Sequence, residues 1–568
     1  MDEIDGGEIL VRGIEAERVR VIFAIADVSY TPVFRSAEQH GIRIVGGRHE
    51  SANVHMAEGW ARATGGVALA MGAMGPGVAN LVPGVINAWI EGLPLLVVAT
   101  QRTQRAHRSI RRGRFQYTPQ IEVFQPVTKF AGAVPDARRI SEYLREAFRC
   151  ALSGRPGPVY LEIADEIFRQ KVDEARVPAA DPTRYRAAPG APDPAGVERA
   201  ATLLAEASLP LLLAGCGVLR AGAWPELRAL AERSAALVVT TNGARGVLPE
   251  DHPQLVLLAS PGGARALSEA DVVLAVGTQV GEMLGYGRPP RWGSPERQRW
   301  IQLDVDPASI GVNRDVDVPL VGDARAGLAA LGQALAARGV NREPSVEARE
   351  MVEVCRKAGA ALVESLAKSA ATPIHPARLA HEVASFFPPD AIVCFDGGNT
   401  TIWAHLFHRF HEPRGLLWTS HFGHLGSGLS YAIAAKLARP DRPVYLFTGD
   451  SAFGFNLQEL ETAVRERAEI VVVICCDFAW GMERLGQQIE MGKTLGVDTA
   501  HVRYDEVARG MGCHGERVED PGEIRPALAR ASAAGRPAVV QVLIDPKENV
   551  NPPGLLEFAR MYRAAEDS

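Results

Sequence analysis

Short runs of β-branched and other apolar residues alternate with longer stretches of helical periodicity along most of the chain. Clear examples of the short runs are residues 210–215 (PLLLAG), 271–277 (DVVLAVG), 444–447 (VYLF) and 471–475 (VVVIC). Continuous apolar strands separated by helices are typical of parallel sheets that helices cover on both faces. The pattern therefore predicts an α/β fold built of doubly wound parallel sheets.

Two segments interrupt this alternation. Residues 177–194 and the polar stretch from Asn341 to about Ala371 combine Pro, Ala and charged residues without periodicity, which is typical of linkers. A chain of 568 residues is also long enough for several domains of the common size, about 100–200 residues. We therefore predict three domains and a tail, at 1–176, 195–340, 371–550 and 551–568.

The first and third parts of the chain end alike. Residues 153–163 (SGRPGPVYLEI) and 534–544 (AGRPAVVQVLI) both place Gly-Arg-Pro before an apolar strand. This match suggests that the two parts are copies of one domain. The middle part would then be an insertion.

Charge and composition exclude some classes of function. The chain has 61 Lys and Arg against 67 Asp and Glu, a formal net charge of −6, which gives no basic surface for nucleic acid. No stretch approaches the ~18 continuous apolar residues of a membrane span, and the acidic N-terminus lacks the apolar core of a signal peptide. We expect a cytoplasmic enzyme with a small-molecule substrate, whose seven cysteines are reduced core residues.

Two aspartates follow neighbouring predicted strands in residues 447–482. Asp450 comes directly after the strand at 444–447 and Asp477 after the strand at 471–475, with an expected helix at 456–467 between them. Two carboxylates at the carboxyl edge of a parallel sheet form an oxygen site suited to Mg²⁺ and a diphosphate. Taken singly, Asp450 could equally cap a helix and Asp477 could lie in a solvated turn.

Glu50 marks a second segment of interest, residues 43–99. The segment is predicted to form a strand, a helix, a strand, a Gly-rich turn, a helix and a strand, and Glu50 begins the first helix. A glutamate in a first helical turn is usually a favourable partner for the helix dipole, and the residue alone allows no more than that.

Together the two segments resemble the thiamine diphosphate enzyme family. Residues 48–65 are similar to its RHE…GYARATG pattern, and Gly75-Pro76-Gly77 with Asn80 to its GPG…N pattern. Residues 449–477 resemble its diphosphate signature, Gly-Asp-Gly followed later by Asn-Asn, although Ser451 replaces the last Gly and Cys476-Asp477 replaces Asn-Asn. The resemblance implies a pyrimidine-binding first domain, a middle domain and a diphosphate-binding third domain.

The resemblance also implies roles for individual residues. Glu50 would contact the aminopyrimidine ring and favour the tautomer that takes the C2 proton of the thiazolium, which is acid–base catalysis within the cofactor. Asp450, Asp477 and the backbone carbonyl of Ala479 would bind Mg²⁺. The implied cofactor-binding residues are Pro76, Asn80, Gly398, Asn399, Thr400, Gly423, Leu425, Gly449, Ser451, Ala452, Trp480, Gly481 and Met482.

In this family the pyrimidine domain of one subunit faces the diphosphate domain of another, so the resemblance implies a homodimer or homotetramer. Gln116 matches a residue that reaches the reacting centre, and its amide could orient the substrate. Asp27 could be a proton shuttle or a plain loop residue. The helix expected at 482–492 offers two further proton carriers, Glu483 and Glu490.

The substrate is predicted less directly. The chain is most similar to the acetolactate synthase-like branch, whereas residues 115–122 (FQYTPQIE) and 285–292 (GYGRPPRW) are more similar to 2-hydroxyacyl-CoA lyases and oxalyl-CoA decarboxylases. A CoA thioester needs cationic groups for its phosphates. Candidates are the six arginines of residues 101–115, which could instead form a solvated or subunit-facing loop, and the pair Arg288 and Arg291.

We therefore expect a 2-hydroxyacyl-CoA lyase, with a decarboxylating carboligase acting on a 2-keto acid as the alternative. Residues 215–222 (GCGVLRAG) could hold ADP, CoA, FAD or nothing. A third alternative is a non-catalytic nucleotide-binding scaffold, suggested by the missing Asn-Asn and by Tyr117 where an acidic residue is common.

Overall fold

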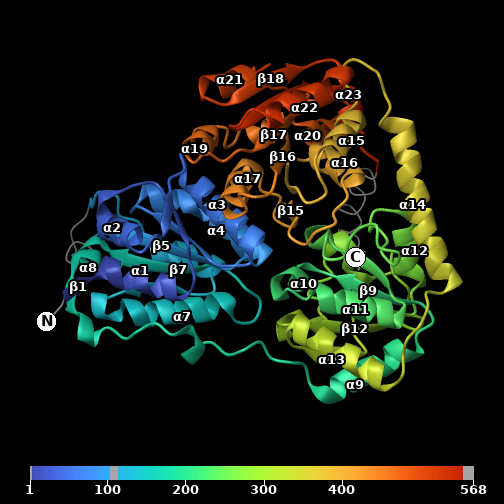
Figure 1. Ribbon diagram of the computed structural model, residues 1–568, viewed down its shortest axis with the longest axis horizontal. Coiled ribbons are helices and arrows are strands. Elements are labelled where there is room, and N and C mark those ends of the chain that lie inside the picture. Colours follow the sequence, from blue (N-terminus) through green and yellow to red (C-terminus); the bar gives the residue numbers. More distant parts are fainter. Residues whose placement is uncertain (1–2, 103–112, 554–568) are drawn as a thin grey trace.

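The computed structural model describes residues 3–102 and 113–553 (Figure 1). Three α/β domains follow one another along the chain, each built on its own parallel sheet. The N-terminal and C-terminal domains lie against each other, and the middle domain lies beside both (Figure 1). The predicted class, three doubly wound parallel-sheet domains, is confirmed.

The N-terminal domain has a six-stranded parallel sheet of order β3-β2-β4-β5-β7-β6. Its strands are β2 (Val21–Ala24), β3 (Arg43–Val45), β4 (Ala68–Gly72), β5 (Leu95–Gln101), β6 (Ala131–Val134) and β7 (Val159–Ala164). The helices are α1 (Gly6–Ala16), α2 (Thr31–Gln39), α3 (Glu50–Thr64), α4 (Pro76–Glu91), α6 (Gln120–Phe124), α7 (Ile140–Leu152) and α8 (Asp165–Arg169). A small antiparallel ladder of β1 (Glu3–Asp5) and β8 (Lys171–Asp173) lies apart from the main sheet.

The C-terminal domain repeats this arrangement strand for strand, in the order β15-β14-β16-β17-β19-β18. Its strands are β14 (Ile392–Asp396), β15 (Leu416–Leu417), β16 (Val444–Gly449), β17 (Val471–Cys476), β18 (His514–Val518) and β19 (Ala538–Leu543). Its helices are α15 (Pro376–Phe386), α16 (Asn399–Phe407), α17 (Ser427–Ala438), α18 (Asp450–Phe453), α19 (Glu459–Arg465), α20 (Gly481–Met491), α21 (Tyr504–Gly510), α22 (Ile524–Ser532) and α23 (Pro546–Asn549). The two Gly-Arg-Pro strands, β7 and β19, occupy the same place in their sheets, as expected for two copies of one domain.

The middle domain has a different sheet, five parallel strands in the order β10-β9-β11-β12-β13. Its strands are β9 (Pro210–Ala214), β10 (Leu237–Thr240), β11 (Val272–Val276), β12 (Arg299–Asp304) and β13 (Val318–Val321). Its helices are α9 (Pro194–Glu206), α10 (Cys216–Ala221), α11 (Trp224–Ser234), α12 (Pro261–Glu269) and α13 (Ala324–Ala337). The change of strand order agrees with an inserted middle part.

One hydrophobic core runs from the N-terminal domain into the C-terminal domain. It includes Val54 and Met56 of α3 together with Tyr431 and Ala432 of α17. The two helices pack closely because Gly59 has no side chain: a Cβ there would lie 2.8 Å from Cα of Tyr431. The two domains therefore form one packed unit, joined through α3 and α17.

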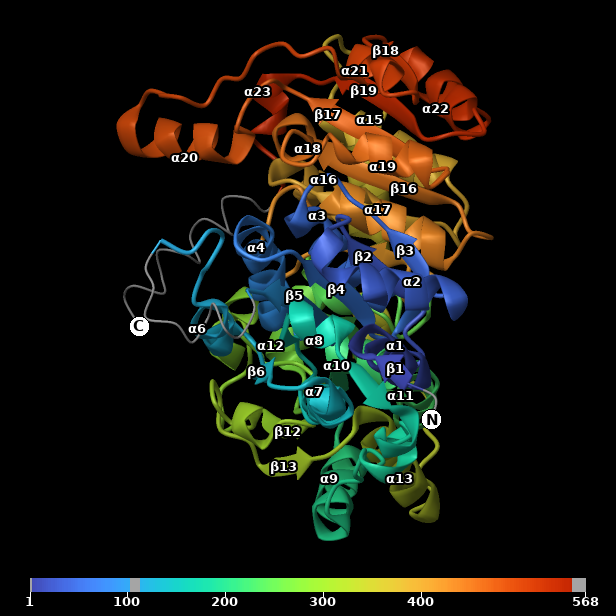
Figure 2. The same ribbon diagram turned by 90° about the vertical axis from the view of Figure 1, so that its left-hand side faces the viewer.

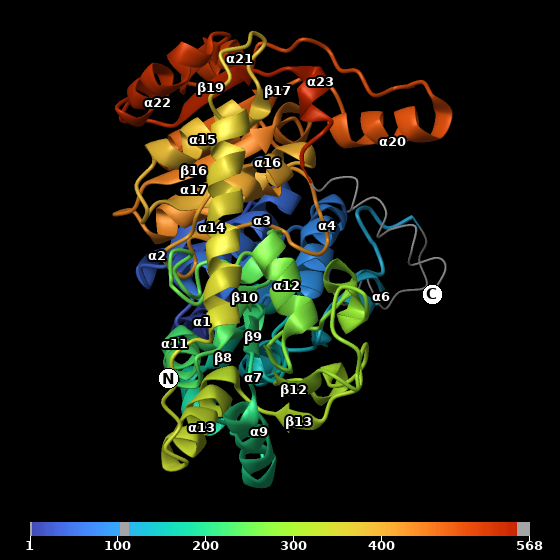
Figure 3. The same ribbon diagram turned by 90° about the vertical axis from the view of Figure 1, so that its right-hand side faces the viewer.

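The structure corrects two predicted elements. The segment after Asn341 is not an irregular linker, since α14 (Val346–Leu366) runs along the side of the molecule between the middle and C-terminal domains (Figure 3). Only Ala348, Met351, Val352 and Cys355 of this helix are buried, so most of its surface is polar and the helical periodicity is weak.

The helix predicted at 456–467 is shorter than expected. Asp450 begins the one-turn helix α18, and α19 starts only at Glu459. Between them the Asn456 amide donates to the carbonyl of Gly426, 2.9 Å away on another loop, and this tertiary contact holds the segment out of a continuous helix.

The cysteines and the lengths of the helices are the last features of the fold. The seven cysteines are all free, and five of them are buried. Within residues 3–102 and 113–553, every helix is too short or too polar to cross a bilayer.

Candidate active site

Asp450 and Asp477 lie side by side at the carboxyl ends of β16 and β17, which pair in parallel. Both carboxylates are buried, with 2% and 8% of the residue exposed. Burial and, after it, the negative charge of Asp477 together raise the pKa of Asp450 to about 7. Burial likewise raises the pKa of Asp477. Two buried carboxylates that repel each other are a site where a cation would be stabilised.

Backbone and amide groups fix the orientation of these carboxylates. Asp450 accepts hydrogen bonds from the backbone N–H of Ser451 (2.7 Å) and of Phe478 (2.8 Å). Asp477 accepts from the Asn549 amide at 2.8 Å and from the backbone N–H of Ala479 at 3.2 Å. The carbonyl of Ala479 accepts from the Ser451 hydroxyl at 3.1 Å, so that this carbonyl is also held at the site.

Oxygen atoms other than those of carboxylates lie beside the pair. The amide nitrogen and oxygen of the Asn399 side chain and the amide oxygen of the Asn549 side chain are buried without a hydrogen-bond partner. A Cβ on Gly481 would lie within 3.1 Å of both Asp477 and Asn399, so these side chains surround one small space. In the described ranges, no three His, Cys, Asp or Glu side chains gather as a metal site. The chemistry therefore fits a hard cation such as Mg²⁺, held by two carboxylates with amide and carbonyl oxygens.

The residues predicted to bind the diphosphate and thiazolium gather around this pair. They line one cleft, which we call the diphosphate half-site where it is formed by Gly398, Asn399, Thr400, Gly423, Leu425, Gly449, Asp450, Ser451, Ala452, Asp477, Ala479, Trp480, Gly481 and Met482. Helices α16 and α18 both begin here, which directs backbone N–H groups toward the space a phosphate would fill. Glu483 and Glu490 also line the cleft, from helix α20, which projects from the body of the C-terminal domain (Figure 2).

Glu50 lies at a different place, on the N-terminal domain. Its half-buried carboxylate accepts a hydrogen bond from the Asn80 amide at 2.9 Å, and a Cβ on Gly77 would lie 3.1 Å from it. Gly75 adopts a positive φ of 74° and contacts the carbonyl of Gln116, an approach that a side chain would block. Glu50, Asn80, Gln116 and residues 75–77 form what we call the pyrimidine half-site.

Asp27 lies near this half-site as a capping residue. Its carboxylate accepts from the backbone N–H of Ser29 at 2.8 Å and from the Ser29 hydroxyl at 2.6 Å. Burial and the negative charges of Asp27 and Glu50 raise the pKa of Tyr30, which places both carboxylates around that phenol. Asp27 therefore stabilises the 3-10 turn at Val28–Tyr30, and its role as a shuttle stays a prediction.

The two half-sites are separate within one chain. The described residues that line the cleft around Asp450 include none of the pyrimidine half-site residues Glu50, Pro76, Asn80 and Gln116. The predicted residues of each group therefore lie near one another, while one chain alone does not bring the two groups together.

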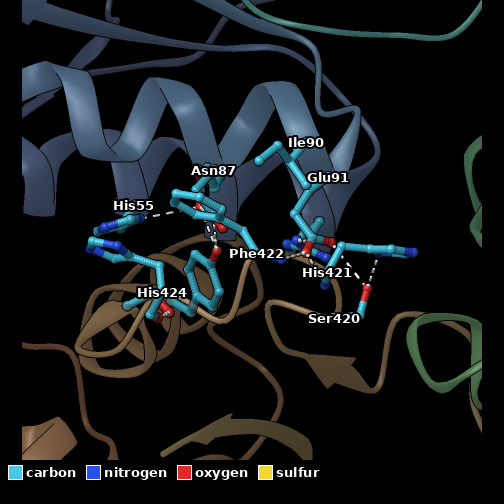
Figure 4. Close-up of polar contacts among 12 residues, drawn as sticks. His55, Asn87, Ile90, Glu91, Ser420, His421, Phe422 and His424 are labelled. Atoms are coloured by element: carbon cyan, nitrogen blue, oxygen red, sulfur yellow. Dashed lines mark hydrogen bonds and ion pairs between the residues drawn. The ribbon is translucent and has the colours of Figure 1, made fainter. Parts of the chain in front are cut away.

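The N-terminal and C-terminal domains meet in a buried polar network (Figure 4). Glu58 accepts from the Tyr431 hydroxyl, from Asn87 at 2.7 Å and from His55 at 3.3 Å. The His55 ring lies 4.8 Å from that of His424. Burial lowers the pKa of His424 to about 4, so the imidazole beside Leu425 is neutral at pH 7.

Glu91 occupies the other end of this network. It accepts from Arg62 at 3.1 Å, from the Ser420 hydroxyl at 3.2 Å and from the backbone N–H of His421 at 2.7 Å. Although burial acts to raise its pKa, the Arg62 charge and the His421 N–H hold the pKa of Glu91 below the usual value. Neither Glu91 nor Asn549 was identified from the sequence, because their contacts join segments far apart in the chain.

The cleft continues from the diphosphate half-site into the middle domain and measures about 3300 Å³. The predicted nucleotide segment contributes Cys216, Gly217, Leu219 and Arg220 to its wall. Further arginines line it from all three domains: Arg62, Arg155, Arg186, Arg245, Arg265, Arg291, Arg325, Arg409 and Arg414. Arg288 does not line the cleft, and most of the six-arginine stretch, residues 103–112, lies outside the described residues.

Comparison with known proteins matches three family models in sequence along the chain. Residues 4–125 match the N-terminal TPP binding domain of thiamine pyrophosphate enzymes, residues 197–331 the central domain and residues 396–542 the C-terminal TPP binding domain. TPP, thiamine pyrophosphate, is another name for thiamine diphosphate.

Whole-length relatives have more than one activity. The acetolactate synthase large subunit of Mycobacterium tuberculosis is 33% identical over 95% of this chain and 96% of its own length. The sulfoacetaldehyde acetyltransferase of Castellaniella defragrans is 29% identical over 94% and 91%. The 2-hydroxyacyl-CoA lyase of Arabidopsis thaliana is 29% identical over 96% of both chains.

Proposed function

This chain belongs to the thiamine pyrophosphate enzyme family, and we propose that it is a lyase that cleaves 2-hydroxyacyl-CoA thioesters. In the proposed reaction the bond between C1 and C2 of the acyl group breaks. The C2 hydroxyl loses its proton to give an aldehyde or ketone, and C1 gains a proton to give formyl-CoA. The reverse reaction would join the same two products.

One observation favours a CoA substrate: a single cleft connects the diphosphate half-site with the arginine-lined wall of the middle domain. Arginine binds phosphate oxygens through its planar guanidinium, and a nucleotide-bearing substrate needs a long cleft of this kind. The segment around Cys216 to Arg220 could hold the nucleotide of CoA itself, or ADP or FAD as a separate ligand.

The residues of the diphosphate half-site fit the cofactor that the family binds. Asp450, Asp477 and the carbonyl of Ala479 would hold Mg²⁺, while the starts of α16 and α18 would hold the diphosphate. When bound, thiamine diphosphate supplies a carbon nucleophile for the carbonyl and an electron sink for breaking the adjacent bond.

The remaining roles belong to side chains of this protein. Glu50, oriented by Asn80, would hold a proton at the aminopyrimidine ring. Gln116 would orient the substrate carbonyl, and Asp27 is a candidate proton shuttle at the same half-site. Glu483 and Glu490 of α20, which line the cleft around Asp450, are candidate proton carriers.

We also propose that the enzyme is at least a homodimer, as a homodimer or homotetramer. The cleft around Asp450 contains none of the pyrimidine half-site residues within one described chain, which supports a site completed by a second copy. The Glu50 of one chain would then face the diphosphate half-site of its partner.

A second candidate is a decarboxylating carboligase of the acetolactate synthase type. Identities of 33% and 30% to acetolactate synthases along nearly the whole chain favour it. In that case pyruvate or another 2-keto acid would replace the thioester.

One experiment separates the two candidates. The protein is incubated with thiamine diphosphate, Mg²⁺ and either a 2-hydroxyacyl-CoA or pyruvate, and the products are identified by mass spectrometry. We expect formyl-CoA and a carbonyl compound from the thioester. Acetolactate without thioester cleavage would reject the lyase proposal.

A matched substrate tests the role of the arginine-lined wall. The corresponding pantetheine thioester has the same reacting atoms but lacks the nucleotide phosphates. Loss of charge-assisted phosphate contacts should raise KM by about tenfold or more. An unchanged KM would contradict binding of the nucleotide in this cleft.

A further inference from the structure

A carboxylate of the C-terminal domain accepts hydrogen bonds from the loop that leads to Glu50. Glu459, the first residue of α19, is fully buried, and its oxygens lie 2.9 and 3.1 Å from the backbone N–H of Arg48. The backbone N–H of His49 donates to it as well, and the Thr462 hydroxyl donates at 2.7 Å. We call residues 46–49 the activator loop, because α3 and Glu50 follow it directly.

A carboxylate of the N-terminal domain likewise accepts backbone hydrogen bonds from the loop that leads to Leu425. Glu91, the last residue of α4, accepts from the backbone N–H groups of His421 (2.7 Å) and Phe422 (3.4 Å). We call residues 419–426 the cofactor loop, since its Gly423 and Leu425 line the diphosphate half-site. Figure 4 shows Glu91 reaching from its helix toward Ser420 and His421.

The contact of Glu459 with the activator loop and that of Glu91 with the cofactor loop are related by the internal repeat of the fold. Strands β4 and β16 hold the same place in the two sheets, so α4 corresponds to the α18–α19 segment. Strands β3 and β15 also correspond, and so do the loops that follow them into α3 and α17. In each domain, therefore, the segment after the equivalent strand holds the equivalent loop of the other domain.

The activator loop and the cofactor loop each position one half-site. Hydrogen bonds to a buried carboxylate are stronger than neutral ones, and losing one leaves buried groups unpaired. The activator loop would lose its fixed position without Glu459, and Glu50 with it. The cofactor loop would move without Glu91, and Leu425 with it.

We propose that Glu459 and Glu91 are reciprocal positioning residues, and that through them the contact between the two domains of one chain couples two active sites. The inference rests on the proposed dimer, in which the pyrimidine and diphosphate half-sites of one chain belong to different active sites. A shift of the N-terminal domain against the C-terminal domain then alters Glu50 at one site and the cofactor loop at the other.

The first test separates activation of the cofactor from its binding. Glu459→Gln should slow exchange of the C2 proton of bound thiamine diphosphate about tenfold, with an unchanged dissociation constant for the cofactor. Glu91→Gln should weaken cofactor binding about tenfold, with little change in the exchange rate of the bound fraction. A residue with only a general structural role would change both quantities together, and that result overturns the proposal.

Milder variants and a matched control keep this test decisive if a substitution impairs folding. Thr462→Val removes one donor to Glu459, and Ser420→Ala removes one donor to Glu91. Each should change the same quantity as the corresponding glutamine variant, by a smaller factor. Glu461→Gln makes the same charge change on α19 at a residue that pairs with Arg465, and neither quantity should change.

Mixed dimers test which of the two active sites each residue positions. A dimer of one wild-type chain and one Glu50→Gln chain has a single working site, made of the wild-type Glu50 and the metal of the variant chain. Adding Glu459→Gln to the chain that keeps Glu50 should lower activity about tenfold, and adding it to the Glu50→Gln chain should not. Glu91→Gln should give the opposite pattern.

The outcomes distinguish the two positioning roles from the proposed dimer. If Glu459→Gln lowers activity equally from either chain, the positioning role is wrong. If both substitutions act only from the chain that keeps Glu50, each active site lies within one chain. That result would reject the active site shared between two chains, while the positioning roles of Glu459 and Glu91 would be retained.

Discussion

The N-terminal and C-terminal domains share one strand order, yet they present their carboxylates differently. Glu50 of the N-terminal domain is half-buried and receives one side-chain hydrogen bond, from Asn80. Asp450 and Asp477 of the C-terminal domain are buried and adjacent, and burial and mutual repulsion raise the pKa of Asp450. One topology thus provides a half-buried carboxylate and a buried pair of carboxylates whose mutual repulsion a cation would relieve.

This difference shows which physical factors distinguish equivalent edges of the two sheets in a repeated fold. Both domains place their residues at the carboxyl ends of parallel strands, where α/β sheets bind ligands. We expect the degree of burial and the number of neighbouring charges to determine whether a carboxylate transfers protons or binds a metal ion. The following predictions test that contrast.

Replacing Glu50 by Gln should have the largest effect. Loss of a positioned acid or base lowers kcat by about 10²–10⁴-fold, whereas the metal and diphosphate contacts remain. Steady-state kinetics and a cofactor titration measure the two quantities. Unchanged turnover would refute the role of Glu50 in activating the cofactor.

Replacing Asp477 should affect binding instead of chemistry. Asp477→Ala removes an oxygen ligand and should weaken Mg²⁺-dependent cofactor binding by at least about 100-fold, while Asp477→Asn keeps an oxygen and should lose less. Calorimetric titration of cofactor at fixed Mg²⁺ provides the values. Equal affinity of the alanine variant and the wild type would reject the ligand assignment.

The residues that orient these carboxylates should reproduce the contrast on a smaller scale. Asn549→Ala removes the amide that holds Asp477, so Mg²⁺ affinity should fall about tenfold with kcat at saturation preserved. Asn80→Ala removes the amide that holds Glu50, so kcat should fall about tenfold with affinity preserved. If the two variants gave the same profile, the two half-sites would not differ in function.

The smallest expected effect concerns the stability of the metal-free protein. An aspartate in the unfolded chain titrates near 3.8, whereas Asp450 titrates at about 7 in the fold, so the folded protein binds the extra proton between these values. Stability should therefore fall as pH rises through that window, and the melting temperature should be higher at about pH 5.5 than at about pH 8.

Saturating Mg²⁺ should abolish or reverse this dependence, because the cation favours the ionised carboxylates. The isosteric variant Asp450→Asn serves as the control for other titrating groups. It should show a smaller pH dependence without metal than the wild type, and an equal dependence would contradict the role of Asp450.

Local sequence patterns were sufficient to predict much of the fold. Buried strands such as β16 and β17 are continuous apolar runs, and Asp450 and Asp477 follow directly after them at one edge of the sheet. The same reasoning placed Glu50 at the start of α3. These features depend on periodicity and on neighbours in the chain, which a sequence displays directly.

Features that depend on distant segments could not be predicted. Helix α14 buries only four residues over its length, so its periodicity is nearly lost among polar positions. The break before α19 depends on a hydrogen bond from Asn456 to another loop. Glu91, Glu459 and Asn549 act through partners remote in the sequence, and no local pattern distinguishes them from ordinary surface residues.

The packing of α3 against α17 has a consequence for the history of this chain. These helices occupy equivalent positions in the two domains, so their contact joins the same surface of each copy, as a two-fold symmetric pair of identical domains would. A single ancestral domain could therefore have paired with itself through this helix before duplication and fusion. Two copies on one chain can diverge separately, and here one copy carries Glu50 while the other carries the buried pair Asp450 and Asp477.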